Sequence, residues 1–320
     1  MSKKVLSCIP KFDERCARAV ELLESNGYEI IRYDGDLVMT REEMKAVGEG
    51  VCAGIVGCET WDADVFDAFP DLKVLARFGV GVDCIDLEDA KRRGIKVCNA
   101  RGMNCASVGE STIMFVLASL RNLVGLTNST KAGGWERHTG TNLKGKTYGL
   151  LGFGAVAQYV AKLLQSFGLE RIIAYDVYKN EEAAKALNVE FVDFETLMRE
   201  SDVMSLHIPC IPQTVDMIGE KEFRMMKKNM VLVNVARGPV VNQDAFYRAL
   251  KEKWIAAGAV DVFTIEPAEE GNPLLTLDNL ICMPHQAADT HETFDEIAYF
   301  DAEIILDVMN GKTPKNWLNP

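Results

Sequence analysis

The stretch GLLGFGAVA, residues 149–157, follows an apolar run that begins at Thr147 and opens an amphipathic segment. Gly-x-Gly-x-x-Ala between a strand and a helix is typical of the first βα turn of a parallel α/β sheet. Gly152 permits the tight turn, Gly154 lets a ligand approach the backbone, and the small Ala157 lets the helix pack on the strand. We therefore predict an α/β fold here, with a helix N-terminus able to bind phosphate groups.

An acidic residue ends the next apolar run. Asp176 follows residues 171–175, at about the 20-residue spacing that is typical of a dinucleotide site. A carboxylate there can accept hydrogen bonds from the adenosine ribose of NAD and would repel the 2′-phosphate of NADP. No arginine follows it directly, although Lys179 is near. We predict NAD as the cofactor; the alternative is a glycine turn that binds nothing.

Short apolar runs alternate with amphipathic segments along the whole chain, which is typical of βα units. Strands are expected at residues 4–9, 28–33, 52–56, 73–77 and 96–98, and again at 147–151, 171–175, 203–207, 231–235, 257–262 and 280–283. Helices are expected at 13–25, 41–47, 64–68, 87–93, 107–128, 242–253 and 290–309. We predict two doubly wound parallel-sheet domains, a Rossmann domain for the cofactor and a flavodoxin-like domain.

The last helical pattern, residues 290–309, has apolar residues at helical spacing but no strand after it. We expect this helix to cross back and pack on the first sheet. The first domain would then be discontinuous, with residues 1–101 and 288–320, and the cofactor domain would comprise residues 102–287.

Length and composition limit the class of protein. At 320 residues, with 48% hydrophobic and 26% charged residues, the chain has the profile of a two-domain globular protein. A net charge of −12 argues against nucleic acid and anionic membranes as partners. The longest uncharged apolar stretch, residues 111–120, is far shorter than the roughly 20 residues of a membrane span. With no signal peptide either, we expect a cytoplasmic protein.

The nine cysteines are scattered and form no Cys-x-x-Cys pair, and there are only four histidines. Reduced thiols in a protein core fit this pattern better than a zinc cluster. We therefore predict no metal site.

Three polar residues follow late strands of the second series: Arg237, Glu266 and His285. Taken singly, each could be an ordinary surface or structural residue. Ligands of doubly wound sheets bind at the carboxyl ends of the strands, which is where all three fall. Reduction of a keto acid needs a proton donor, a cation for the carboxylate and a group that sets the pKa of the donor. The three together therefore predict an acid–base site for a small 2-hydroxy or 2-keto acid.

The sequence resembles the D-isomer-specific 2-hydroxyacid dehydrogenases, from about Leu72 to Thr290. The matching motifs are RFGVGVD (residues 77–83), GKT (145–147) before the glycine turn, SLHIP (205–209), VARG (235–238) and PH (284–285). The resemblance implies that His285 is the general acid or base and that Glu266 orients its imidazole and raises its pKa. It also implies that Arg237 binds the substrate carboxylate.

The resemblance further implies a binding role for several residues. It assigns the substrate carboxylate to backbone N–H groups at Val80 and Gly81. It assigns the cofactor to Gly152, Gly154, Ala155, Val156, Asp176, His207, Pro209, Ala236 and Asp261, with Asp261 at the nicotinamide end. It also implies closure about hinges near residues 100–107 and 287–290, and a homodimer formed through the cofactor domains.

Three positions depart from the common family pattern: Arg101 stands where Pro is frequent, Cys84 where Asn is usual, and Ser111 where His is common. The phosphoglycerate enzymes carry arginines in the loop after the third strand, whereas residues 56–61 here read VGCETW, with one acid and no arginine. We therefore expect an unphosphorylated substrate. The alternatives are a D-3-phosphoglycerate dehydrogenase, a formate or phosphite oxidising enzyme on the same fold, and an NAD-sensing, corepressor-like scaffold.

Overall fold

The computed structural model describes residues 3–35 and 38–320, which form two compact units. The N-terminal unit comprises the described residues up to Asn104 together with Asp289–Pro320, and the central unit comprises Cys105–Ala288. Each unit is an α/β domain with its own sheet.

The N-terminal unit is built on a parallel sheet of five strands in the order β2-β1-β3-β4-β5. This is the flavodoxin-like order, so the prediction for this domain is confirmed. Nearly continuous apolar runs form these strands because both faces of the sheet are covered. The strands are β1 (Lys4–Ser7), β2 (Glu29–Arg32), β3 (Val51–Val56), β4 (Val74–Arg77) and β5 (Lys96–Asn99).

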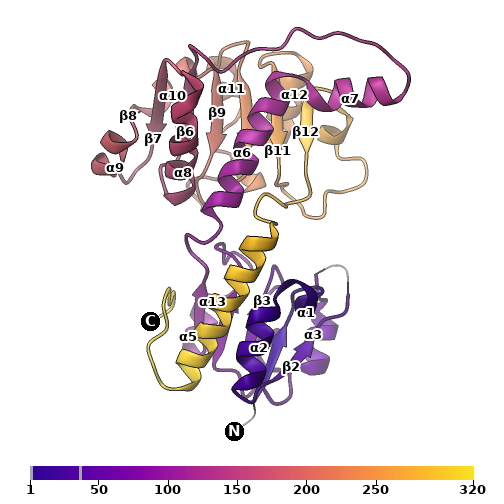
Figure 1. The fold of residues 1–320 in the computed structure, drawn as a ribbon, viewed down its shortest axis with the longest axis vertical. Coiled ribbons are helices and arrows are strands. Elements are labelled where there is room, and N and C mark those ends of the chain that lie inside the picture. Colours follow the sequence, from indigo (N-terminus) through magenta and orange to yellow (C-terminus); the bar gives the residue numbers. More distant parts are fainter. Residues whose placement is uncertain (1–2, 36–37) are drawn as a thin grey trace. The chain divides into compact units, whose positions relative to one another are not determined.

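Helices cover both faces of this sheet. One core contains residues of α1 (Phe12–Arg15), α2 (Ala17–Ser25) and α13 (His291–Met309), and the other contains residues of α3 (Arg41–Val47), α4 (Ala63–Phe66) and α5 (Leu87–Arg92). The helix α13 packs against α2, β3 and β4 (Figure 1). Five of the six apolar residues at helical spacing, Phe294, Ile297, Ala298, Ile304 and Ile305, are buried, and the sixth, Val308, is partly buried. The helix also buries Thr293, Asp301 and Ala302, which the spacing does not predict.

The central unit has a parallel sheet of seven strands in the order β12-β11-β10-β9-β6-β7-β8. The order reverses beside β6, as in a Rossmann domain, so this prediction is also confirmed. The strands are β6 (Thr147–Leu151), β7 (Arg171–Tyr175), β8 (Val189–Phe191), β9 (Val203–Leu206), β10 (Val231–Asn234), β11 (Ala257–Val260) and β12 (Leu280–Cys282).

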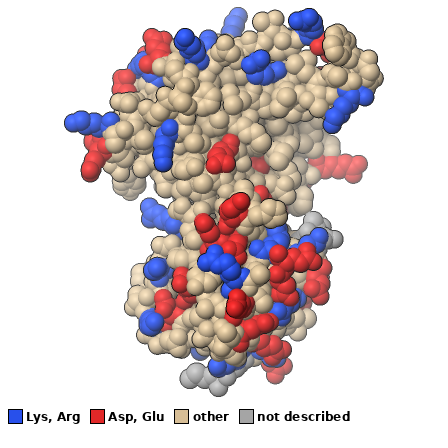
Figure 2. All heavy atoms as spheres, viewed as in Figure 1, with Lys and Arg blue, Asp and Glu red and all other residues tan. Residues whose placement is uncertain are grey.

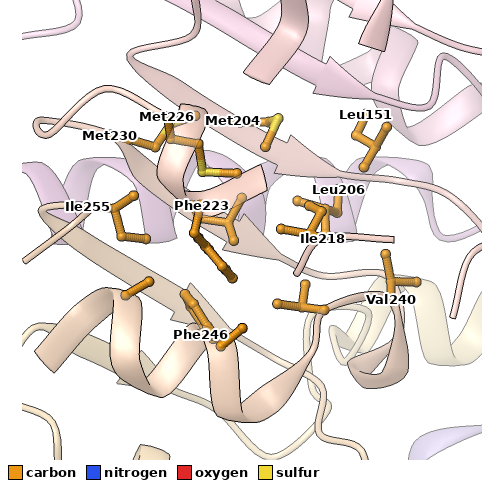
Figure 3. Close-up of a cluster of buried hydrophobic side chains, with 14 of the residues drawn as sticks. Leu151, Met204, Leu206, Ile218, Phe223, Met226, Met230, Val240, Phe246 and Ile255 are labelled. Atoms are coloured by element: carbon orange, nitrogen blue, oxygen red, sulfur yellow. The ribbon is translucent and has the colours of Figure 1, made fainter. Parts of the chain in front are cut away.

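Two cores hold the helices of the central unit on the sheet. One face packs against α6 (Cys105–Leu120) and α8 (Ala155–Leu164), and the other against α10 (Phe194–Glu200), α11 (Glu220–Met225) and α12 (Gln243–Lys251). Figure 3 shows the second core, where the rings of Phe223 and Phe246 stack with centroids 5.5 Å apart. The other helices of this unit are α7 (Leu123–Lys131) and α9 (Glu181–Ala186).

Two of the expected helices are wrong in extent because each is interrupted. The helix predicted at residues 13–25 breaks at Cys16, whose φ of −134° and ψ of 38° are not helical. The helix predicted at residues 107–128 ends at Leu120, and a new one begins after Asn122, whose φ is 49°. Asparagine tolerates this left-handed conformation better than most residues. The strand β8 was not predicted.

Acidic and basic side chains lie side by side on the face of the N-terminal unit that Figure 2 shows. The ion pairs of this unit include Arg18–Asp295 and Arg32–Asp13. Exposed pairs of this kind contribute little to stability, because water and salt screen the charges. Within residues 3–35 and 38–320, every helix is too short or too polar to cross a membrane.

Candidate active site

The glycine turn follows β6 in the central unit. Gly152 has a φ of 91°, and a Cβ there would lie 2.7 Å from the carbonyl oxygen of His207, so only glycine fits. Gly154 caps α8 and is different, because a Cβ there would meet no atom within 4 Å. Gly154 and Ala155 are exposed and Val156 is half-buried. The N-terminus of α8 therefore faces open space, which is the geometry that a bound pyrophosphate requires.

Asp176 lies directly after β7 and beside the glycine turn. Its carboxylate accepts hydrogen bonds from the backbone N–H of Phe153 at 2.6 Å and of Tyr178 at 2.9 Å. Each carboxylate oxygen keeps a second lone pair for a ligand hydroxyl. Asp176 thus fixes the shape of the turn and leaves a half-buried negative charge next to it.

His207 follows β9 next to the same turn. Its Nε2 lies 2.8 Å from the hydroxyl of Ser205, which accepts a hydrogen bond from the buried Tyr148 hydroxyl at 3.0 Å. Burial lowers the pKa of His207 to about 3, so its imidazole is neutral and cannot serve as a cationic acid. Pro209 lies exposed two residues further on.

Arg237 is presented by a turn after β10. The buried Asn234 holds this turn, because its side chain accepts from the N–H of Ala236 at 3.0 Å and donates to the carbonyl of Arg237 at 2.9 Å. At Gly238, a Cβ would overlap the backbone of Phe263, so glycine allows the Arg237 turn to press against the loop after β11. The Arg237 guanidinium also donates to the carbonyl of Ala236 at 2.7 Å.

Glu266 and His285 form a hydrogen-bonded pair. His285 Nδ1 lies 2.6 Å from Glu266 Oε2, and the other oxygen, Oε1, accepts from the N–H of Phe263 at 2.9 Å. Burial opposes ionisation of Glu266, but these hydrogen bonds and the nearby Arg237 charge outweigh it and lower the pKa of Glu266. An ionised carboxylate only accepts hydrogen bonds, so Nδ1 of His285 carries the hydrogen and Nε2 is left for proton transfer.

Asp261 supports the loop that carries His285. Its side chain is 1% exposed, and its two oxygens accept from the N–H groups of Gln286 and Ala287, both at 2.8 Å. The N–H of His285 donates to the carbonyl of Asp261 at 2.7 Å. These bonds hold His285 at a φ of 55°, a conformation that L-residues rarely adopt. The structure therefore gives Asp261 a positioning contact that the sequence did not indicate.

Val80 and Gly81 lie in the N-terminal unit, in the loop after β4. Asn99 donates to the carbonyl of Val80 at 2.7 Å, and the Arg77 guanidinium donates to the carbonyl of Gly81 at 2.7 Å. Both residues are half-buried. Side chains at the ends of β4 and β5 thus hold the loop in place through its carbonyl groups.

The loop after β3, whose sequence VGCETW has one acid and no arginine, turns that acid toward its own backbone. Glu59 is 3% exposed, and its carboxylate accepts a hydrogen bond from the N–H of Gly57 at 2.7 Å. Trp61 is fully buried, whereas Cys58 is exposed. Glu59 therefore stabilises its own loop, and the acid in VGCETW is no barrier to an anion.

The three departures from the family pattern lie in different surroundings. Arg101 is exposed after β5, Cys84 is half-buried with its thiol 3.8 Å from the carbonyl of Gly57, and Ser111 on α6 donates to the carbonyl of Ala287 at 3.0 Å. Ser111 thus helps to hold the segment after His285.

Sequence reasoning missed Asn234 and Asn99, which shape the two loops that carry the candidate substrate-binding groups. Each is a buried amide that ends a strand directly after two or more apolar residues. A buried polar side chain needs a partner, so this position in the pattern was a usable signal.

Comparisons with known proteins identify the family of this chain. Residues 113–287 match the sequence profile of "D-isomer specific 2-hydroxyacid dehydrogenase, NAD binding domain". A D-3-phosphoglycerate dehydrogenase from Archaeoglobus fulgidus is 38% identical over 319 residues, which are 99% of this chain but only 59% of that protein. A glyoxylate reductase from Korarchaeum cryptofilum is 39% identical over 264 residues, 81% of this chain and 79% of its own length.

Among solved structures, the TT0316 protein from Thermus thermophilus aligns with a TM-score of 0.91 at 30% identity, covering 98% of this chain and 99% of that one. The profile spans more than half of the chain, and the two curated relatives each cover over four fifths of it. The chain therefore belongs to the D-isomer-specific 2-hydroxyacid dehydrogenase family, and residues 113–287 are its NAD-binding domain.

Proposed function

We propose that this chain is an NAD-dependent dehydrogenase that interconverts a small, unphosphorylated 2-keto acid and its D-2-hydroxy acid. The observation that carries the proposal is the 2.6 Å pair of His285 and Glu266, with the Arg237 charge close enough to lower the pKa of Glu266. Hydride transfer is the chemistry that NADH supplies when bound. The protein must then supply a proton and hold the acid in place.

His285 is the proposed proton carrier. Because Glu266 accepts from Nδ1, only Nε2 can give a proton to the carbonyl oxygen during reduction or take one from the hydroxyl during oxidation. The Glu266 carboxylate fixes the orientation and the tautomer of the ring. His207 does not compete for this role, since burial lowers its pKa to about 3.

Arg237 and the loop at Val80 and Gly81 are the proposed carboxylate-binding groups. The planar guanidinium matches two oxygens of a carboxylate better than an ammonium does. Backbone N–H groups add donors without adding charge. The proposed cofactor groups are those at the glycine turn, namely Gly152, Gly154, Ala155, Val156 and Asp176, with His207, Pro209, Ala236 and Asp261 beside them.

The absence of arginine from the loop at residues 56–61 supports an unphosphorylated substrate. Cys58 and Thr60 are the exposed residues of this loop, and the Glu59 carboxylate is turned inward. A phosphate would therefore find no cation within this loop. A phosphoglycerate substrate is the second candidate, because one of the two curated relatives is named a D-3-phosphoglycerate dehydrogenase.

The test is NADH oxidation, followed by the absorbance of the reduced nicotinamide, with a panel of 2-keto acids. Glyoxylate, hydroxypyruvate, pyruvate, longer aliphatic and aromatic keto acids and phosphohydroxypyruvate form the panel. We expect turnover of an unphosphorylated acid, and loss of about two to four orders of magnitude in His285→Ala with NADH binding retained. If phosphohydroxypyruvate is the best substrate, the second candidate replaces the first. If NADH binds and no acid reacts, the remaining candidates are a substrate outside the panel and an NAD-sensing scaffold.

We also propose a cytoplasmic homodimer formed through α6 and α7. Their side chains Met114, Leu117, Leu123 and Val124 are 38–56% exposed, and Trp135 after α7 is 84% exposed. Apolar side chains that cluster on a protein surface often belong to a contact with another protein. Analytical ultracentrifugation should find a dimer for the wild type and a monomer for Leu123→Glu; a monomeric wild type would exclude the dimer.

A further inference from the structure

The loop Phe78–Gly81, between β4 and α5, has all four of its carbonyl groups bound from within the N-terminal unit. The carbonyl of Phe78 accepts from Arg77 Nη1, and that of Gly81 accepts from Arg77 Nε at 2.7 Å. Between them, the carbonyl of Gly79 accepts from the N–H of Ala100 at 2.8 Å, and that of Val80 from Asn99 at 2.7 Å. The loop therefore turns its acceptors toward the ends of β4 and β5.

In contrast to these carbonyls, three consecutive N–H groups of the loop are unbonded within the part of the chain that the structure describes. Among the described residues, the N–H groups of Val80, Gly81 and Val82 have no hydrogen-bond acceptor. All three residues are half-buried. A run of consecutive amides without acceptors is a binding site for an anion, because each N–H carries partial positive charge and costs free energy if it stays unpaired.

Arg77 lies directly under this loop, where its guanidinium donates to two carbonyls and lies 3.5 Å from the Cys58 sulfur. At Gly79, a Cβ would overlap Arg77 Nη1, so this glycine, with a φ of 134°, lets the guanidinium reach the backbone. The acid that faces Arg77 from α13 is Asp301, which is fully buried with both oxygens unpaired. Burial raises the pKa of Asp301 well above its usual range, which disfavours the carboxylate form that would neutralise Arg77. Burial also raises the pKa of Glu59, although the Arg77 charge opposes this.

We propose that Arg77 is a positioning residue for the substrate carboxylate, acting through the loop. Its guanidinium holds the carbonyls of Phe78 and Gly81 inward, so that the amides of Val80, Gly81 and Val82 face an incoming carboxylate with a positive charge behind them. This inference rests on the proposed function. Arg77 itself touches backbone and the Cys58 sulfur, whereas Arg237 in the central unit is the proposed direct ligand.

The test compares Arg77→Met and Arg77→Lys with the wild type, using the best keto acid from the panel. We expect Arg77→Met to raise KM by about tenfold to a hundredfold, the range for losing charge-assisted hydrogen bonds, while kcat changes far less. Arg77→Lys keeps the charge and can reach one carbonyl, so its KM should lie between the KM of the wild type and that of Arg77→Met. The Kd for NADH should not change, since the cofactor residues belong to the central unit.

Arg93→Met is the matched control, because Arg93 is an arginine of the same unit whose ion pairs with Asp67 and Asp89 are remote from the loop. It should leave KM unchanged. A folded Arg77→Met with wild-type KM overturns the inference. If Arg77→Met does not fold, Arg77→Lys decides instead, and a wild-type KM in that variant overturns it. A wild type that turns over no keto acid removes the proposed function itself, which is a different outcome.

Discussion

At the scale of single residues, the two oxygens of Glu266 have different partners, and this makes Glu266→Gln informative. Oε1 accepts from the N–H of Phe263, so a glutamine would keep its oxygen there and turn its NH₂ toward His285. Nδ1 of His285 would then have to accept, and the hydrogen would move to Nε2. We expect kcat for keto acid reduction to fall by about two to four orders of magnitude, because the ring loses the carboxylate that orients it and sets its tautomer.

The matched control is Glu270→Gln, which removes the same charge from an exposed position of the same loop. NADH binding should be unchanged in both variants. Near wild-type turnover in Glu266→Gln would show that proton transfer does not depend on the pair.

Asp176→Asn tests the choice of cofactor. An amide keeps the shape of the side chain, and it can still accept from the N–H of Phe153 or Tyr178, but the charge that would repel a 2′-phosphate is lost. We expect the ratio of kcat/KM for NADH to that for NADPH to fall by about tenfold or more. Asp278→Asn, at an exposed site, is the control. An unchanged ratio would mean that the ribose is recognised elsewhere.

Residue types at strand ends were predictable from the sequence, whereas their partners were not. Arg237, Glu266 and His285 stand out because ligands of parallel sheets bind where strands end. The inward turn of the Glu59 carboxylate toward Gly57 depends on a loop conformation that no spacing rule encodes. The same holds for the contacts of Asp261 with Gln286 and Ala287, because they join segments far apart in the chain.

At the scale of elements, a substitution at the N-terminus of α8 tests whether the cofactor binds there. A methyl group at Gly154 has room and needs no unusual φ, so Gly154→Ala should fold with an unchanged Tm. It would occupy the open space above the helix N-terminus, and we expect the Kd for NADH to rise by about tenfold or more. Titration of NADH fluorescence measures this.

Gly219→Ala is the matched control, because its Cβ would make only ordinary contacts at the start of α11. It should leave the Kd for NADH unchanged. If Gly154→Ala binds NADH as well as the wild type does, the open space at α8 is not where the cofactor lies.

The helix boundaries show where periodicity alone is insufficient. The apolar pattern of residues 107–128 predicts one helix, yet the chain turns at Asn122 and starts α7 in a new direction. A single left-handed residue costs little for asparagine and leaves the hydrophobic spacing on both sides intact. The strand β8 was missed because three residues at a sheet edge carry too little pattern to be recognised.

At the scale of the whole molecule, Asp301 makes the stability of the N-terminal unit depend on pH. Burial raises the pKa of its carboxyl in the folded protein above the usual value of 3.8. The folded state therefore binds a proton that the unfolded chain releases, and stability falls as the pH rises above the unfolded pKa. We expect Asp301→Asn to raise Tm more at about pH 8 than at about pH 5, by roughly 2–4 °C for each kcal/mol recovered.

Calorimetry at the two pH values measures this, and Asp307→Asn, nearer the end of α13 and not fully buried, is the control. Equal shifts of Tm at both pH values would show that Asp301 is ionised in the folded protein. The sequence predicts the two-sheet architecture but not this buried acid, because a single Asp in a helical pattern is normally placed at the surface.

The packing of α13 against β3 and β4 also determines the order in which the two units can complete their folding during synthesis. The side chains of Ile304 and Ile305 fill the core of a sheet whose last strand, β5, ends at Asn99. The ribosome delivers them only after the whole central unit has emerged. The central unit can then fold as a self-contained insertion. Until the last helix arrives, the first-made sheet keeps the part of its apolar face that α1 and α2 do not cover open to chaperones or aggregation.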